Sequence, residues 1–102
     1  MCKKRKNIRL LKFREQDGLC YYCERKMWER CEGSNKEKRP NLICTAEHLQ
    51  ARQDGGRDLA DNIVAACKWC NSRRHMRPKP LDPVAYKNHV QQRLRQGKWH
   101  PC

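Results

Sequence analysis

The stretch TAEHLQARQDGGRDLADNIVAACKWCN, residues 45–71, decides the fold that we expect for this chain. The segments 42–49, with Leu, Ile and Thr, and 62–66, with Ile and Val, have the composition of strands. The polar loop between them contains two consecutive glycines, which favour a turn. A helix is expected over residues 67–77, because Pro78 disfavours helical geometry in the residue before it. The stretch therefore predicts two strands joined by a long loop and followed by a helix.

Eight cysteines occur in the chain, and four of them form two Cys-x-x-Cys pairs, Cys20 with Cys23 and Cys67 with Cys70. Two such pairs have the spacing of a four-thiolate site, so we predict a structural Zn²⁺. A redox-active pair is expected beside a βαβ unit, which this order of elements does not provide. The other cysteines are expected to be free thiols, although two of them bracket a polar loop (Cys31 and Cys44) and could pair or bind metal; the full set is Cys2, Cys31, Cys44 and Cys102.

Helices are also expected on both sides of this unit. The first covers residues 5–16, and the second follows Asp82, whose side chain suits an N-cap, with Pro83 at the first helical position. One face of the second helix carries apolar side chains that should pack inward, namely Tyr86, Val90 and Leu94. We expect a single α+β domain over 1–102, with a core (17–77), a basic N-terminal helix (1–16) and a C-terminal helical extension (78–102).

The formal net charge of +13 is concentrated at the two ends of the chain. Residues 1–19 carry a net +5 and residues 71–102 a net +7, whereas the centre is nearly neutral. Basic ends of this kind suit the phosphate backbone of nucleic acid, with a solubilising surface as the alternative. No apolar stretch is long enough to span a membrane, and no apolar signal segment follows the N-terminus, so we expect a cytoplasmic protein without a membrane partner.

A second set of polar residues has a telling spacing. Asn62 lies 14 residues after His48, Asn71 lies 23 after it, and His75 follows Asn71 by one helical turn. Together with the Glu-His pair, the Gly-Gly loop, the Asn-Ile-Val strand and the CKWCN helix start, this pattern resembles the HNH endonuclease family, whose fold is the ββα-metal finger. The segment DGLCYYCERKM resembles the knuckle that precedes the motif in the zinc-bearing branch, so the resemblance covers residues 17–77.

The resemblance implies a role for each matching residue. His48 would be the general base, Glu47 the first ligand of a catalytic divalent ion, and Asn62 the brace of the loop that orients the His48 ring. Asn71, alone or with His75, would complete the metal site. Most of the family has Asp-His where this chain has Glu-His, and Glu is one methylene longer, so metal affinity or preference is expected to differ.

Phosphodiester hydrolysis makes the same demands independently of the resemblance. It needs a base for the attacking water, which a histidine provides near neutral pH, and a cation that offsets charge on the phosphate. Glu47 and Asn71 offer oxygen ligands that suit Mg²⁺, whereas a nitrogen from His75 would favour Mn²⁺, Ni²⁺ or Zn²⁺. Neighbours in a regular strand point to opposite faces, so Glu47 and His48 can share a site only where the strand ends or bends.

DNA is the expected partner, and basic side chains in three segments are candidates to hold its phosphates. They are Arg73, Arg74 and Arg77 on the helix, Arg52 and Arg57 in the loop, and Lys3, Lys4, Arg5 and Lys6 near the N-terminus. One site makes one cut, so a double-strand break would require a homodimer or two successive binding events. The alternatives are a non-catalytic zinc-ribbon module that binds nucleic acid and, less favoured, an assembly protein, for which the charge has no explanation.

Overall fold

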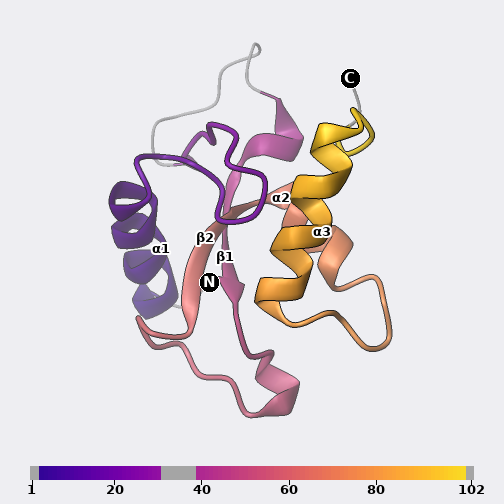
Figure 1. Ribbon diagram of the computed structural model, residues 1–102. Coiled ribbons are helices and arrows are strands. Elements are labelled where there is room, and N and C mark those ends of the chain that lie inside the picture. Colours follow the sequence, from indigo (N-terminus) through magenta and orange to yellow (C-terminus); the bar gives the residue numbers. More distant parts are fainter. Residues whose placement is uncertain (1–2, 31–38, 101–102) are drawn as a thin grey trace.

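The computed structural model describes residues 3–30 and 39–100, and it confirms the α+β fold (Figure 1). The elements in chain order are α1 (Lys3–Glu15), the 3-10 turn η2 (Pro40–Leu42), β1 (Cys44–His48), the 3-10 turn η3 (Arg52–Asp54), β2 (Ile63–Cys67), α2 (Lys68–Arg74) and α3 (Pro83–Arg95). Three cysteines that bear on the predictions, Cys2, Cys31 and Cys102, lie outside the described residues. Within residues 3–30 and 39–100, none of the helices has the length and apolar character needed to cross a bilayer.

The two strands form an antiparallel hairpin at the centre of the molecule. Cys44 pairs with Cys67 and His48 with Ile63, so the register places the Glu-His pair at the end of the hairpin where the connecting loop begins. Every residue of β2 is buried, which agrees with its run of apolar side chains. The Gln16 side chain bonds to both the N–H and the carbonyl of Ala65, so it continues the ladder on the free edge of β2.

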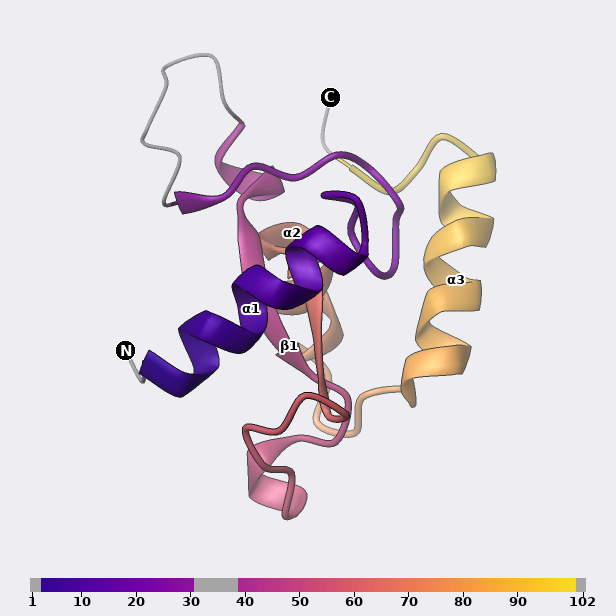
Figure 2. The ribbon, with the colours of Figure 1, turned by 90° about the vertical axis from the view of Figure 1, so that its left-hand side faces the viewer.

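Helices cover both faces of the hairpin. Figure 2 shows α1 running across one face, with α2 behind the strands. α1 has a buried arginine, Arg9, whose guanidinium donates two hydrogen bonds to the Glu29 carboxylate, the shorter at 2.7 Å. This pairing allows a basic helix to pack closely without leaving a buried charge uncompensated.

α3 packs beside α2 and closes the core on the other side. The Asp82 side chain accepts a hydrogen bond from the Ala85 N–H, which confirms the predicted N-cap, and Pro83 takes the first helical position. Tyr86 and Val90 are buried as expected, and the Tyr86 hydroxyl donates to the Cys70 carbonyl at 2.6 Å. The apolar face of α3 is therefore anchored directly on the helix that carries the second cysteine pair.

The loop between the strands is shaped by its double glycine. Gly55 has φ of 92°, a conformation that side chains with a Cβ rarely adopt. Gly56 packs backbone to backbone, because a Cβ there would lie only 1.8 Å from the Gln50 carbonyl oxygen. The loop thus folds back on itself just after the end of β1.

The predicted helix 67–77 is too long. α2 ends at Arg74, and His75 adopts φ of −90° and ψ of 6°, outside the helical geometry. The Met76 N–H then bonds to the Arg73 carbonyl, which tightens the last turn before the prolines. The helix therefore ends three residues before the position that Pro78 alone would set.

Candidate functional site

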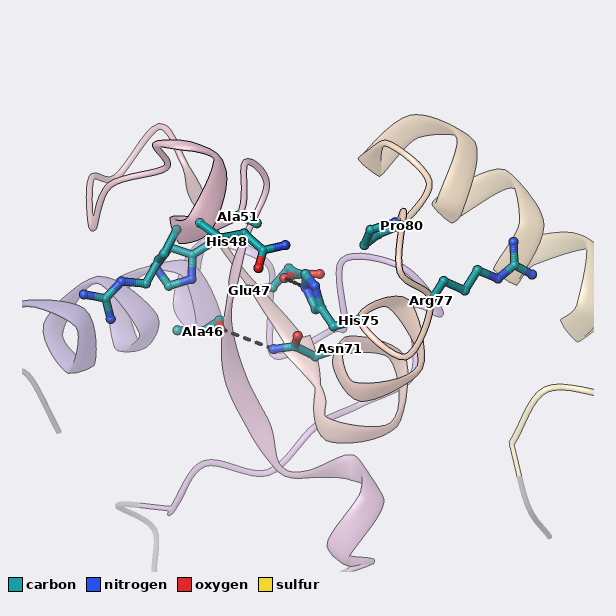
Figure 3. Close-up of a pocket in the computed structure, with 10 residues that line it drawn as sticks. Ala46, Glu47, His48, Ala51, Asn71, His75, Arg77 and Pro80 are labelled. Atoms are coloured by element: carbon teal, nitrogen blue, oxygen red, sulfur yellow. Dashed lines mark hydrogen bonds and ion pairs between the residues drawn. The ribbon is translucent and has the colours of Figure 1, made fainter.

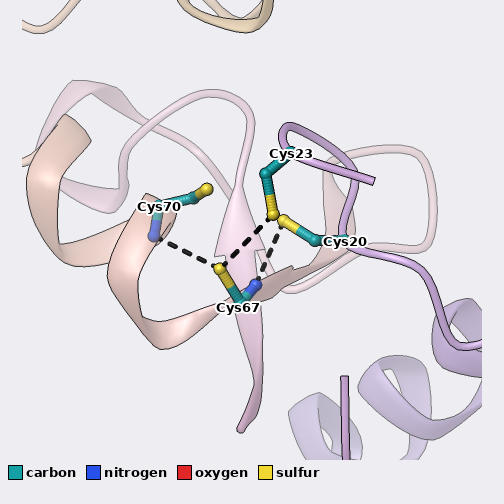
Figure 4. Close-up of side chains that lie close together, drawn as sticks. All are labelled: Cys20, Cys23, Cys67 and Cys70. Atoms are coloured by element: carbon teal, nitrogen blue, oxygen red, sulfur yellow. Dashed lines mark hydrogen bonds between the residues drawn. The ribbon is translucent and has the colours of Figure 1, made fainter. Parts of the chain in front are cut away.

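The four cysteines of the two Cys-x-x-Cys pairs lie together in the core (Figure 4). Their sulfur atoms are all within 4.8 Å of one another, and all four residues are buried; we call Cys20, Cys23, Cys67 and Cys70 the cysteine cluster. A tetrahedral Zn²⁺ with bonds of about 2.3 Å places its sulfurs about 3.8 Å apart. The Cys23 and Cys67 sulfurs are 3.9 Å apart, so the cluster fits a structural zinc ion.

Surrounding donors prepare these sulfurs to carry negative charge. The Cys67 N–H donates to Cys20 Sγ at 3.3 Å, and the Cys70 N–H donates to Cys67 Sγ at 3.4 Å. The neighbouring cysteines, Cys23 first, lower the pKa of the Cys20 thiol, whereas the interaction with Cys20 raises the pKa of Cys70. Four thiols this close cannot all ionise without a cation, so the donor set calls for a metal.

An aromatic side chain near the C-terminus completes this environment. The Trp99 indole N–H donates to Cys70 Sγ at 3.2 Å, and the ring packs edge-on against Tyr86. Hydrogen bonds of this kind orient and stabilise metal-binding thiolates. The segment after α3 therefore contributes to the cysteine cluster, which its sequence gave us no reason to expect.

A second, very different site opens at the end of the hairpin. A cleft of about 380 Å³ is lined by β1, the following loop, α2 and the segment after it, with Glu47, His48, Asn71 and His75 among its residues. Figure 3 shows Glu47, Asn71 and His75 close together at its centre, with His48 on one side and Arg77 on the other. Although Glu47 and His48 are neighbours in a strand, β1 ends at His48, so both side chains reach the same cleft.

Glu47 is almost completely buried, and its two oxygens have different surroundings. Oε2 accepts hydrogen bonds from the Tyr22 hydroxyl at 3.1 Å and from the Arg74 guanidinium at 3.2 Å. Burial raises the pKa of Tyr22, so its phenol stays protonated and donates. Oε1 instead lies 2.9 Å from His75 Nε2 at the floor of the cleft. One oxygen is thus bonded to Tyr22 and Arg74 in the interior, while the other pairs with His75 in the cleft.

Asn71 is oriented by the strand that it packs against. Its side-chain amide N–H group donates to the Thr45 hydroxyl at 3.0 Å and to the Ala46 carbonyl at 3.3 Å. These two bonds use the nitrogen and turn the amide oxygen toward His75 (Figure 3). Together with Glu47 Oε1 and His75 Nε2, this oxygen makes up a set of three possible metal ligands in the cleft.

His48 has a carboxylate partner from the loop. Its Nε2 lies 2.7 Å from an oxygen of Asp58, and both side chains are largely buried. The hydrogen bond to His48 holds the pKa of Asp58 below its usual range, with smaller contributions from Arg5 and Arg52. Asp58 in the loop therefore fixes the ring of His48 in the same cleft as the Glu47 carboxylate.

Asn62 fastens that loop at its base. Its side-chain oxygen accepts from the Gln50 N–H at 2.8 Å, and its nitrogen donates to the carbonyls of Gln50 and Arg57. These three bonds close the loop across its two ends, directly before Asp58.

The match to known families agrees with this geometry. A family model described as HNH endonuclease matches residues 20–77, more than half of the 102 residues. The chain belongs to the HNH endonuclease family. Its cysteine cluster fits the zinc-bearing branch of that family. Searches of curated proteins and of solved structures gave no match.

One predicted DNA contact of this HNH domain is wrong. The Arg74 side chain is only 6% exposed, and its guanidinium donates four hydrogen bonds inside the protein. It bonds to Glu47 and to the carbonyls of three residues, Leu81, His48 and Leu49. Arg74 therefore holds the cleft together and is not available to a phosphate.

The other basic candidates of the HNH domain lie in different surroundings. Arg52 and Arg77 line it, whereas Arg73 is exposed and stacks over the Trp69 ring at 4.0 Å. Arg57 is exposed on the loop beside Asn62. On α1, three lysines are exposed (Lys3, Lys4 and Lys6), while Arg5 is half-buried with its Nε 3.9 Å from Asp58.

Sequence reasoning missed three residues that act on the two sites: Tyr22, Asp58 and Trp99. Tyr22 lies inside the first Cys-x-x-Cys, a position that predicts packing but not a bond to Glu47. Asp58 is one of three aspartates in the loop, and spacing alone does not show which of them reaches His48. Each contact depends on how distant segments meet, so no local signal could have identified it.

Proposed function

We propose that this chain is a metal-dependent endonuclease that hydrolyses phosphodiester bonds of DNA. The observation that carries the proposal is the convergence of Glu47 Oε1, His75 Nε2 and the Asn71 amide on one side of a cleft that also presents His48. A structural zinc module needs only the cysteine cluster, and it does not require these four side chains in one cleft.

His48 acts as the general base in this proposal. It accepts the proton of the water that attacks the phosphorus atom, a task that a histidine can perform near neutral pH. Asn62 keeps the loop closed through its bonds to Gln50 and Arg57, and so keeps the His48 ring beside the donor set. Arg52 and Arg77 line the cleft and hold the phosphates that flank the reacting one.

The catalytic ion would be held by Glu47, Asn71 and His75. Two ligand atoms at right angles around an ion of the size of Mg²⁺ lie about 3 Å apart. Glu47 Oε1 and His75 Nε2 are 2.9 Å apart, so this pair fits. A divalent ion held by these residues would offset charge on the scissile phosphate and stabilise the leaving oxygen. The histidine nitrogen favours Mn²⁺ or Ni²⁺, while the two oxygens also admit Mg²⁺.

The substrate is DNA, bound through its backbone by the basic residues that line the cleft and by those along α1. The exposed lysines of α1, namely Lys3, Lys4 and Lys6, extend this surface beyond the cleft. One chain presents one set of reactive groups, so it cuts one strand in each encounter. Cleavage of both strands requires a homodimer or a second encounter.

The test is cleavage of supercoiled plasmid by the purified zinc-loaded protein with Mg²⁺, Mn²⁺ or Ni²⁺. The metal-free arm uses buffer passed over a chelating resin, since a strong chelator would also strip the cysteine cluster. We expect ion-dependent nicking, and at least about a 100-fold lower rate for His48→Ala with DNA binding retained. His89→Ala is the matched control, because His89 lies on α3 and contacts Tyr86 and Trp99 outside the cleft.

Two results would contradict the proposal. Cleavage that persists in His48→Ala would place the chemistry elsewhere. Binding of DNA without cleavage under every ion would instead support the alternative, a zinc-clamped module that binds nucleic acid without cutting it.

A further inference from the structure

Asp58 occupies a position that the family pattern of this chain does not assign. Its Oδ1 lies 2.7 Å from His48 Nε2, and only 13% of the His48 side chain and 17% of the Asp58 side chain are exposed. The Asp58 carboxylate therefore faces the ring edge of His48 in a place where little water competes.

The loop and α1 both fix this carboxylate in place. The residue before it, Arg57, has its carbonyl held by Asn62 at 3.0 Å. The second oxygen of Asp58, Oδ2, lies 3.9 Å from Arg5 Nε on α1. Gly56, two residues earlier, leaves no room for a Cβ, because its backbone packs directly against the backbone of Gln50. Asp58 is consequently positioned by the fold and is not a side chain that happens to lie near His48.

The chemistry of this pair selects one form of the imidazole. An ionised carboxylate only accepts hydrogen bonds, so the ring nitrogen that faces it must carry the proton. In neutral His48 that nitrogen is Nε2, and Nδ1 then keeps a free lone pair. Without a partner, the histidine ring can rotate, and its proton can move between the two nitrogens by exchange with solvent. Only part of the population then has Nδ1 ready to accept a proton.

We propose that Asp58 is a positioning residue that fixes the ring and the tautomer of His48, so that Nδ1 is the atom that accepts the proton. The proposal rests on the nuclease function proposed above. Asp58 does not touch the substrate, and its effect passes through His48 alone. The same logic accounts for carboxylate–histidine pairs in other hydrolases, where the acid holds the ring without taking its proton.

The first experiment measures the tautomer directly and does not depend on activity. Long-range ¹⁵N–¹H spectra of the zinc-loaded protein, with His48→Ala used for assignment, should show His48 as the Nε2–H form in the wild type. Asp58→Ala should give a mixture of both tautomers. An unchanged single tautomer in Asp58→Ala would overturn the proposal.

The second experiment separates kcat from KM under the ion that supports cleavage. Asp58→Ala should lower kcat about 10- to 100-fold and leave KM for DNA within about twofold. Asp58→Glu should recover part of kcat, because it restores the carboxylate. Asp54→Ala is the matched control, because Asp54 is an exposed acidic residue of the same loop.

The outcomes distinguish this proposal from the nuclease function itself. A wild type that never cleaves DNA contradicts the nuclease function, and the tautomer result is still interpretable. A wild type that cleaves, together with an Asp58→Ala variant of unchanged kcat, contradicts the role of Asp58. Equal losses in zinc content and folded fraction across Asp58→Ala and Asp58→Glu would assign Asp58 a purely structural role and also overturn the proposal.

Discussion

The cysteine cluster and the cleft are two candidate metal sites built on opposite principles. The cluster has four donors of one kind, all of them buried and all within 4.8 Å. The cleft has a carboxylate, an amide and an imidazole, and the imidazole of His75 is 36% exposed. A closed set of four thiolates is typical of structural zinc, whereas an open set with fewer protein ligands leaves room for substrate and water.

The two sites are nevertheless connected by adjacent residues. Tyr22 lies between Cys20 and Cys23, and its hydroxyl bonds to Glu47 in the cleft. Cys70 belongs to the cluster, and the next residue, Asn71, belongs to the cleft. The closed site therefore fixes the positions of donors in the open one. Perturbing the cluster should disturb both sites, whereas perturbing the cleft should leave the cluster intact.

The largest effect should come from removing one cluster sulfur. Cys70→Ser should lose zinc and its cooperative thermal transition, because structural zinc contributes a share of stability comparable with the about 5–15 kcal/mol that holds a domain together. The measurements are metal content by mass spectrometry and melting followed by circular dichroism. Cys44→Ala is the control: Cys44 is buried but outside the cluster, so that variant should keep its zinc and a cooperative transition. A Cys70→Ser protein that melts like the wild type would contradict a structural role for the cluster.

A smaller effect is expected from the buried arginine of the cleft. Arg74→Ala leaves the Glu47 carboxylate without its buried cationic partner, so we expect a loss of about 3 kcal/mol in the free energy of unfolding, with zinc content unchanged. Arg73→Ala removes the same charge from the same helix at an exposed position, and it should cost less than about 1 kcal/mol. Urea denaturation of both variants gives the comparison. Equal losses would mean that Arg74 contributes only surface charge.

The smallest effect should come from the Trp99 indole, which contacts the cysteine cluster. Trp99→Phe removes the N–H that donates to Cys70 Sγ, and it should speed zinc transfer to a colorimetric chelator about fivefold, as the loss of a hydrogen bond of about 1 kcal/mol implies. Trp28→Phe is the control, because its indole N–H donates to the Arg39 carbonyl and not to a sulfur. If both variants release zinc at the wild-type rate, the bond to Cys70 does not protect the metal.

The order of elements could be predicted from the sequence because each had a local cause. Apolar runs marked β1 and β2 to within two residues, and Asp82 with Pro83 marked the start of α3. The end of α2 could not be predicted, since the turn at His75 closes before the proline has any effect. The Cys-x-x-Cys spacing predicted which sulfurs meet, because a shared ion imposes one geometry on them.

The cleft was predictable only in part. The resemblance to the HNH family implied that Glu47, His48, Asn71 and His75 would share a site, and the structure brings all four to one cleft. Charge, by contrast, gave no information on burial: Arg73 and Arg74 are identical neighbours, yet one is exposed and the other buried. That difference depends on which side of α2 faces the hairpin, which is a property of the assembled fold.

The pairing of Arg74 with Glu47 has a consequence for the electrostatic potential of the cleft. A lone buried carboxylate would attract cations strongly but would also cancel much of the charge of any ion that it bound. Here the guanidinium, 3.2 Å from Glu47 Oε2, already balances the carboxylate. The pair contributes almost no net charge, so a divalent ion at Oε1 would keep nearly its full double charge for the anionic backbone that enters the cleft. The protein would thus hold a cation through a carboxylate without shielding that cation from phosphate.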